Sequence, residues 1–208
     1  MSAFEIETPN PESTERVGRL LALELEPGAC VLLHGDLGAG KTCMVRGLAA
    51  GLGCDAGVVH SPTFTVMNRY PGSLANLAHV DAYRIGSAEE LRDAGVEVGA
   101  PDAVLAIEWP DRAQGLDVAD AVHVTITPVD AETRRIRVEA RKGTLPERLA
   151  AALAPRPCPS CQLPVGPFEP EWPFCRARCR SADLGKWFGG HYQISRPLES
   201  RDLEEGVE

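Results

Sequence analysis

The chain has 208 residues, of which 44% are hydrophobic and 5% aromatic, and 21 basic against 30 acidic side chains give a formal net charge of −9. This composition excludes a disordered chain and a collagen-like repeat, and it predicts one packed domain with room for a small appendage. There is no uncharged apolar run of 18 residues and no secretory signal pattern at Met1–Glu5, so we expect a soluble, cytoplasmic protein without membrane contact. The acidic balance argues against a broad nucleic-acid-binding face.

Charge and cysteine content both divide the chain. Residues 1–155 carry a net charge of −8 and three scattered cysteines, residues 156–196 carry +3 and four cysteines, and the last twelve residues carry −4. Pro155 and Pro157 cannot continue a helix and are typical of a linker. We therefore predict a body over residues 1–154, a small module over 155–196 and an acidic, disordered tail over 197–208.

The body begins with a helix pattern and a strand pattern. An amphipathic helix is predicted over residues 13–25, with Ser13 as its N-cap, and the uncharged run at 30–34 predicts a strand that is buried on both faces. A glycine-rich turn follows, and then a helix over residues 41–52. This order is typical of an α/β fold.

The rest of the body alternates between strand and helix signals. Ser87 opens a capping box, which predicts a short helix, and residues 144–153 predict a closing helix. Apolar or alternating runs predict the remaining strands at 64–70, 74–80, 104–107, 122–126 and 136–140. We therefore expect an α/β layer fold with a mixed sheet and flanking helices.

The turn at residues 35–42 reads Gly-Asp-Leu-Gly-Ala-Gly-Lys-Thr and matches G-x-x-x-x-G-K-[ST] at every fixed position. Its backbone N–H groups and the helix N-terminus would face phosphates, Lys41 would reach the β- and γ-phosphates, and the Thr42 hydroxyl would bind Mg²⁺. With this loop between a strand and a helix, the mixed sheet is expected to be P-loop NTPase-like; the alternative is a tight glycine turn with an exposed lysine. The predicted nucleotide contacts are Gly35, Asp36, Leu37, Gly38, Ala39, Gly40, Lys41 and Thr42.

Two acidic residues follow apolar strands. Asp81 ends the strand at 74–80 and Glu108 ends the strand at 104–107, where open α/β sheets gather their ligands. Each could instead cap the loop that follows. Because neither Lys142 nor Lys186 completes the [NT]-K-x-D pattern of guanine recognition, adenine is the favoured base.

Four motifs stand in order along the body: the loop at 35–42, Ser-Pro-Thr-Phe at 61–64, Asp-Ala-Tyr-Arg at 81–84 and Glu-Trp-Pro at 108–110. In this order they resemble TsaE, the small ATPase of bacterial tRNA threonylcarbamoyladenosine synthesis, over about residues 4–150. The resemblance implies ATP hydrolysis in a complex with the TsaB and TsaD proteins, with tRNA reached through that complex.

The resemblance also implies roles for individual residues. Lys41, Asp81 and Glu108 would be the catalytic set; Thr42 and Glu108 would hold Mg²⁺, and Asp81 would position water or metal-bound water. Residues 61–63 would form a switch loop, Trp109 would border the site, and Thr14 would lie near the adenine. Cys43 departs from the family, which usually has a second threonine there, and this leaves the metal hydroxyl of Thr42 in place.

The second module carries two close cysteine pairs separated by thirteen residues. Four thiolates at this spacing suit a closed, structural Zn²⁺ site, and a module this small would need the metal in order to fold. Two disulfides or an iron–sulfur cluster are the alternatives. The predicted zinc ligands are Cys158, Cys161, Cys175 and Cys179.

Residues 156–196 resemble YacG, the small zinc protein described as a DNA gyrase inhibitor. The motifs that accompany the cysteines are Trp-Pro-Phe at 172–174, Asp-Leu-Gly-Lys-Trp at 183–187 and Tyr-Gln-Ile at 192–194, whereas Gln162 replaces the usual glycine. The resemblance implies binding to the gyrase B subunit. With bound zinc the module would carry only about +1, so protein binding is favoured over DNA binding.

Two classes of function therefore compete. One is an ATPase in tRNA modification, and the other is a gyrase-binding protein in which the ATPase acts as a nucleotide-dependent switch. A P-loop small-molecule kinase is a more distant alternative.

Overall fold

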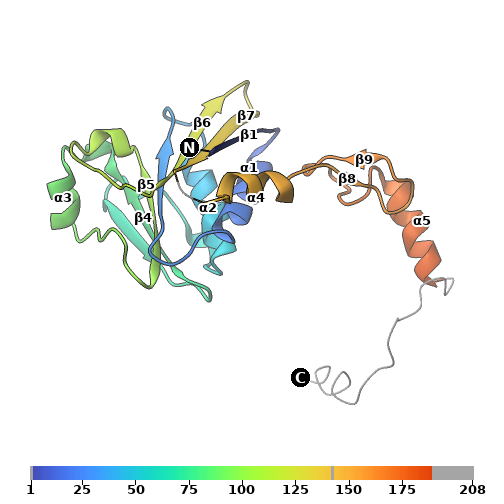
Figure 1. The fold of residues 1–208 in the computed structure, drawn as a ribbon, viewed down its shortest axis with the longest axis horizontal. Coiled ribbons are helices and arrows are strands. Elements are labelled where there is room, and N and C mark those ends of the chain that lie inside the picture. Colours follow the sequence, from blue (N-terminus) through green and yellow to red (C-terminus); the bar gives the residue numbers. More distant parts are fainter. Residues whose placement is uncertain (1, 142, 189–208) are drawn as a thin grey trace, which may run out of the picture. The chain divides into compact units, whose positions relative to one another are not determined.

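The computed structural model describes residues 2–141 and 143–188 and separates the chain into two compact units, Met1–Leu153 and Ala154–Glu208 (Figure 1). The tail predicted at 197–208 and the Tyr-Gln-Ile motif at 192–194 lie outside the described residues. None of the helices in the described ranges has the length and apolar character that a membrane span requires.

The first unit is built on one seven-stranded mixed sheet with the order β1-β7-β6-β2-β5-β4-β3. The four central strands β6, β2, β5 and β4 are mutually parallel, and β1, β7 and β3 are antiparallel to their neighbours. The strands are β1 (Ser2–Thr8), β2 (Cys30–His34), β3 (Met67–Tyr70), β4 (Asn76–Asp81), β5 (Ala103–Glu108), β6 (Val122–Pro128) and β7 (Arg134–Ala140). The predicted α/β fold with a mixed sheet is confirmed.

The register of the central strands brings three chain segments together at the carboxyl-terminal end of the sheet. Leu33 near the end of β2 and Asp81 at the end of β4 are both paired with Glu108 at the end of β5. Because parallel strands end on the same side of a sheet, the turn after β2 and the two acidic residues meet there.

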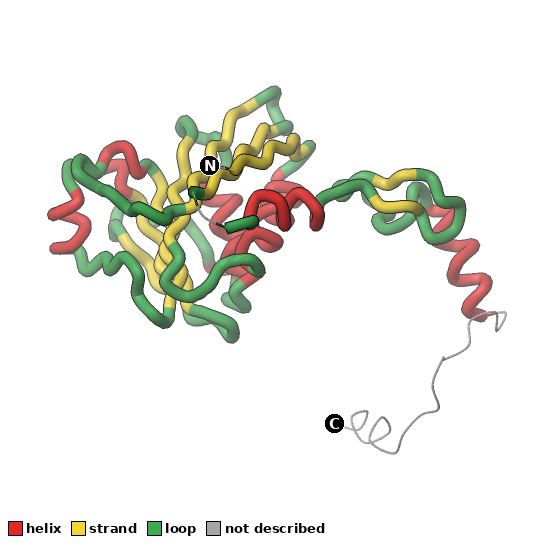
Figure 2. Tube along the Cα trace, viewed as in Figure 1, coloured by secondary structure: helices red, strands yellow, loops and turns green. Residues whose placement is uncertain are grey.

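Helices α1 (Pro11–Ala22) and α2 (Lys41–Gly51) lie side by side, and α2 also contacts β4 and β5 (Figures 1 and 2). Their close approach depends on glycine, because a Cβ atom on Gly47 would stand 2.1 Å from the carbonyl oxygen of Glu15. Two further helices lie within the described part of this unit, α3 (Ala88–Asp93) and α4 (Leu145–Ala152). Short 3-10 turns occupy Ala56–Val58, Ala82–Arg84 and Pro110–Arg112.

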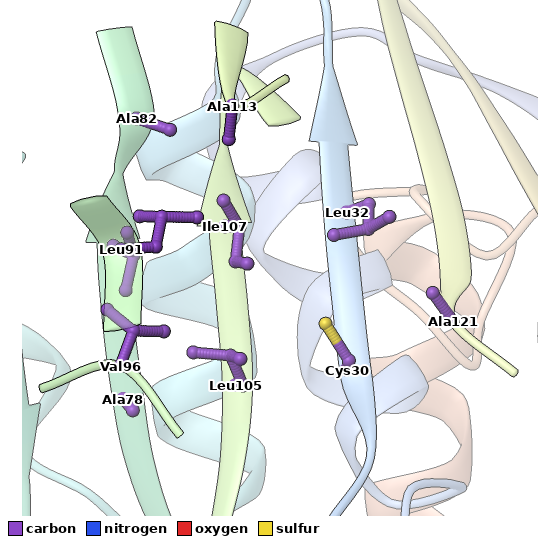
Figure 3. Packing of buried hydrophobic residues seen from close by; sticks show 11 residues of the cluster. Cys30, Leu32, Ala78, Ala82, Leu91, Val96, Leu105, Ile107, Ala113 and Ala121 are labelled. Carbon is purple, nitrogen blue, oxygen red and sulfur yellow. The ribbon is translucent and has the colours of Figure 1, made fainter. Parts of the chain in front are cut away.

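The core explains why the central strands are continuously apolar. Every residue of β5 is buried, as expected for a strand covered on both faces. Leu91 of α3 and the nearby Val96 belong to one buried cluster with residues on one face of β2, β4 and β5, and they lie over β4 and β5 (Figure 3). The cluster drawn there consists of Cys30, Leu32, Ala78, Val80, Ala82, Leu91, Val96, Leu105, Ile107, Ala113 and Ala121.

Two details differ from the sequence predictions. Helix α1 begins at Pro11, and its N-cap is Asn10, whose side chain accepts a hydrogen bond from the N–H of Ser13 at 2.8 Å; the prediction of Ser13 as the cap was wrong. Proline at the first helical position suits this start, since it has no N–H to leave unpaired. Strand β1 was not predicted, and it pairs along its whole length with β7.

The second unit has its own small core. A two-stranded hairpin of β8 (Arg156–Pro157) and β9 (Pro164–Val165) precedes helix α5 (Ala177–Phe188). Its buried cluster comprises Cys158, Val165 and Cys179, with Phe174 and Cys175 packed against it. Most of this core is therefore made of cysteines of the predicted metal site.

Candidate functional site

A cavity of about 500 Å³ opens at the carboxyl-terminal ends of β2, β4 and β5. It brings together Lys41, Thr42, Asp81 and Glu108, the charged and hydroxyl side chains of the predicted site. Gly35, Asp36 and Ala39 belong to the same loop but are not among the lining residues. The cavity is lined by Leu37, Gly38, Gly40, Lys41, Thr42, Cys43, Ser61, Thr63, Asp81, Tyr83, Glu108 and Trp109.

The loop between β2 and α2 is held in the form that its glycines allow. Gly40 is the N-cap of α2 and has a φ of 110°, a value that residues other than glycine rarely adopt. The Ala39 carbonyl accepts a hydrogen bond from Nε of Arg134 at 3.0 Å, so β7 supports the loop from across the sheet. The first residues of α2, Lys41, Thr42 and Cys43, line the cavity, at the helix end where the first N–H groups have no partner within the helix and the helix dipole is positive.

Lys41 is almost fully buried at the first position of α2. Its Nζ donates to the carbonyl oxygens of Gly35 at 2.8 Å and Asp36 at 2.9 Å, and it lies 3.7 Å from the centre of the Trp109 ring. Burial lowers the pKa of Lys41, and the negative charges of the nearby carboxylates act in the opposite direction. The loop thus holds the ammonium group of Lys41 at the cavity. None of the described salt bridges joins this group to a carboxylate.

Glu108 contacts two polar side chains through one of its carboxylate oxygens. Its Oε1 accepts from the Thr42 hydroxyl at 2.8 Å and lies 2.9 Å from Nε2 of His79. The exposed fractions are 3% for Glu108 and 0% for His79, so this carboxylate is shielded from water by the sheet. Glu108 therefore links the loop to the interior of the first unit.

Asp81 is held by the segment that resembles a switch loop. Its Oδ2 accepts from the hydroxyls of Ser61 at 2.9 Å and Thr63 at 2.6 Å, while Oδ1 accepts from the backbone N–H of Tyr83 at 3.0 Å. The last of these bonds is the loop-capping contact that was the alternative interpretation for this residue. Asp81 thus caps the turn after β4 and also lines the cavity.

Two aromatic side chains border the cavity. Trp109 has a φ of 59°, which is unusual for a large side chain, and its backbone N–H donates to the Leu33 carbonyl at 3.3 Å. Its ring meets Tyr83 edge-on with 5.2 Å between centroids. Strained backbone of this kind costs about 1–3 kcal/mol and is concentrated at functional sites.

Thr14, which was predicted to lie near a base, does not line the cavity. It is 1% exposed, and its Oγ1 lies 2.8 Å from Oγ1 of Thr8 in β1. The start of α1 nevertheless adjoins the cavity, because the lining residue Cys43 donates through Sγ to the Pro11 carbonyl at 3.2 Å. Contact between Thr14 and a nucleotide stays a prediction.

Sequence reasoning missed two contributors to this site. His79 stands in an apolar strand pattern, and a buried polar residue at such a position is the signal that could have identified it. Arg134 gave no comparable signal, since it is one of several arginines in a hairpin and reaches the loop only through the fold.

The second unit gathers its four cysteines into one cluster. All seven cysteines of the chain are free thiols, and the Sγ atoms of the predicted ligands lie within 4.8 Å of one another. Sγ of Cys175 is 3.4 Å from that of Cys161 and 3.6 Å from that of Cys179. Four sulfurs around a tetrahedral Zn²⁺ at about 2.3 Å stand about 3.8 Å apart, so the cluster fits such an ion.

The thiols of this cluster differ in acidity. Burial would raise the pKa of Cys158, but backbone N–H groups of Cys175, Cys161 and Ser160 lower it to about 6. The hydrogen bond with Cys161, together with burial, raises the pKa of Cys175 to about 12. At neutral pH the cluster therefore holds a thiolate beside a thiol, and a divalent cation would favour loss of the remaining protons.

Comparison with known proteins relates the first unit to a protein family. The sequence model of "Threonylcarbamoyl adenosine biosynthesis protein TsaE" matches residues 8–136, which is more than half of the chain. The chain belongs to the TsaE family. The same comparison matches residues 156–205 to the family "DNA gyrase inhibitor YacG", so the two predicted resemblances are both confirmed.

Individual TsaE proteins agree with this placement. The TsaE protein of Streptomyces coelicolor is 43% identical over 131 residues, which cover 53% of this chain and 87% of the relative. That of a Nostoc species is 35% identical over 145 residues, covering 67% of this chain and 87% of the relative. The crystal structure of Bacillus subtilis YdiB superposes with a TM-score of 0.58 at 28% identity, covering 73% of this chain and 96% of YdiB.

Proposed function

We propose that the chain is a cytoplasmic, Mg²⁺-dependent ATPase that is required for threonylcarbamoyladenosine modification of tRNA. The observation that carries the proposal is the convergence of Lys41, Thr42, Asp81 and Glu108 on one cavity at the carboxyl ends of parallel strands, in a chain of the TsaE family. Residues 1–154 would form the ATPase domain, and residues 155–196 would form a separate zinc module.

The oxygen atoms that the site offers as ligands suit Mg²⁺. Thr42 supplies a hydroxyl and Glu108 a carboxylate, and these oxygen donors lie 2.8 Å apart beside the loop. In this proposal Thr42 and Glu108 hold the ion, and the bound ion would neutralise charge on the β- and γ-phosphates. Lys41 would contact the same phosphates as a point charge.

Asp81 is proposed to position the attacking water. Its Oδ2 is already an acceptor for two hydroxyls of the segment 61–63, so movement of that segment would change which donors the carboxylate meets. This arrangement supports a switch in which the segment orders around the γ-phosphate. Trp109 and Tyr83 would limit access of bulk water to the cavity.

The partners are proposed from the family. TsaB and TsaD would bind the ATPase, and tRNA would be reached through them, because the acidic first unit offers no broad face for phosphate contacts. Leu37, which lines the cavity, and Phe64, which follows the lining residue Thr63, are both exposed and are suited to a protein contact of this kind.

Glu108→Ala should lower ATP turnover at least about tenfold while nucleotide binding without Mg²⁺ changes little, because it removes a metal ligand and no phosphate contact. Steady-state hydrolysis in the presence of TsaB, TsaD and Mg²⁺ measures this. Glu147→Ala, which removes an exposed acid of α4, is the matched control. Full turnover by Glu108→Ala would refute the assignment of this carboxylate.

A second function is proposed for the zinc module, namely binding to the gyrase B subunit. The cysteine cluster and the match to the gyrase-inhibitor family favour it, and α5 exposes Leu184, Trp187 and Phe188, with Trp187 59% exposed. Such aromatic side chains are frequent binding hot spots.

Trp187→Ser should weaken binding of the full-length chain to gyrase B by about 30-fold, the scale of a hot-spot residue, without altering ATP affinity. Surface plasmon resonance with immobilised gyrase B gives both the affinity and its zinc dependence. Ser181→Ala, an exposed change on the same helix, should bind like the wild type. Equal binding by both variants would exclude this face of α5 from the interface.

A further inference from the structure

We infer that His79 is the positioning residue of the metal-binding carboxylate: its Nε2–H donates to Oε1 of Glu108 and sets the orientation in which that side chain meets the metal. The inference rests on the proposed function, because it assigns a partner to Glu108 as a Mg²⁺ ligand. It concerns a residue that none of the sequence motifs above contains.

The position of His79 fits this role. It lies two residues before Asp81 on β4, opposite Ala106 of β5, and Glu108 follows two residues further along β5. Because side chains two residues apart on a strand share a face, His79 and Glu108 point to the same side of the sheet. Their 2.9 Å contact is therefore fixed by strand register and does not depend on a flexible loop.

The hydrogen-bond partners identify the tautomer. Nε2 faces Glu108, whereas Nδ1 is buried and has no hydrogen-bond partner among the described residues. A carboxylate oxygen only accepts, so the proton belongs on Nε2, and Nδ1 is left as a lone pair. The opposite tautomer would bury an unpaired N–H and would place two acceptors against each other.

The two described hydrogen bonds to Glu108 both fall on Oε1. One of these donors is Thr42, whose own oxygen is a proposed metal ligand, so its hydroxyl cannot orient the carboxylate independently of the metal. His79 is the donor that stands apart from the metal and the nucleotide. Partners behind a ligand fix its orientation in many metal sites, and their loss typically lowers metal affinity by about 10–100-fold.

A purely structural histidine is the competing interpretation. His79 is fully buried in β4 and has apolar neighbours on both sides along the strand. Burying an imidazole there costs free energy unless its nitrogen atoms form hydrogen bonds. A structural role would affect folding and all nucleotide binding together. A positioning role would affect only the part of the binding that depends on Mg²⁺.

Histidine nitrogen NMR on the full-length, wild-type chain reads the tautomer directly. The chain has five histidines, and the His79 ring can be assigned through its backbone resonances. We expect the Nε2–H form, with a proton that exchanges slowly with water. An Nδ1–H ring, or a rapidly exchanging proton, would overturn the inference without any variant having to fold.

Calorimetry of ATP binding, with EDTA and then with Mg²⁺, tests the role. The gain in affinity on adding Mg²⁺ should fall at least about tenfold in His79→Leu and be largely retained in His79→Gln, whose side-chain amide can replace the Nε2–H donor. Binding in EDTA should stay within about twofold, and thermal melting of each variant reports its folding.

The outcomes separate the two claims. If the wild-type chain does not bind ATP, the proposed function fails. If the wild type binds ATP with a gain from Mg²⁺ and His79→Leu keeps that gain, or loses affinity equally in EDTA and Mg²⁺, the positioning role is refuted. The absence of any Mg²⁺ gain in the wild type would refute it as well.

Discussion

Replacing Lys41 with alanine should weaken ATP binding by about 100-fold or more. Among the described residues that line the cavity, its ammonium group is the one side-chain cation, and charge-assisted hydrogen bonds to phosphate oxygens contribute about 1.5–3 kcal/mol each. Two of its three N–H groups donate to loop carbonyls, so the loss of one such hydrogen bond, at the upper end of this range, accounts for the expected change. Isothermal titration calorimetry with full-length protein measures it.

The fold should tolerate this change. Lys41 donates to two loop carbonyls and contacts Trp109 but takes part in no described salt bridge, so the melting temperature should change by only a few degrees. Arg148→Ala removes a cation of α4 that pairs with Glu24 at 2.8 Å, and it should leave ATP binding unchanged. Unaltered ATP affinity of the Lys41 variant would mean that the nucleotide is bound elsewhere.

Removal of zinc should unfold the second unit and spare the first. Its buried cluster is built mainly from cysteine ligands, so little apolar burial remains when the metal is withdrawn. Elemental analysis should give about one zinc per chain, since a closed tetrahedral site uses four thiolates. Limited proteolysis after chelation should digest residues after Leu153, while ATP affinity is retained.

Zinc affinity should also rise with pH. Zinc has to displace the proton of Cys175, whose pKa is raised to about 12, whereas Cys158, with a pKa of about 6, is already ionised at neutral pH. Competition with a chromophoric chelator at several pH values measures this.

Cys54→Ser, which alters a cysteine of the first unit, should leave the zinc content unchanged, whereas Cys158→Ser should lower it. Loss of ATP binding together with zinc would show that the two units are not independent.

The parts of the fold that depend on local pattern could be predicted. β2 and β5 are covered on both faces and are therefore continuously apolar, which makes them visible in the sequence. The loop at 35–42 is specified by glycine conformations and by the lysine that follows them, so its place between strand and helix could be inferred from eight residues.

Features that depend on distant partners could not be predicted. β1 exists because β7, more than 120 residues later, offers an edge to pair with. The start of α1 at Pro11 depended on Asn10 outcompeting Ser13 as a cap, a choice that several polar residues in a row leave open. His79 and Arg134 reach the site only through strand register, which the sequence alone does not specify.

Threonylcarbamoyladenosine in tRNA from cells that lack this chain is the most direct measure of the central claim. Mass spectrometry of tRNA nucleosides should show the modification absent in such cells and restored by the wild-type chain. Lys41→Ala should not restore it, and Cys158→Ser, which disables only the zinc module, should restore it fully. Full restoration by Lys41→Ala, or a normal level of the nucleoside without the chain, would contradict the account.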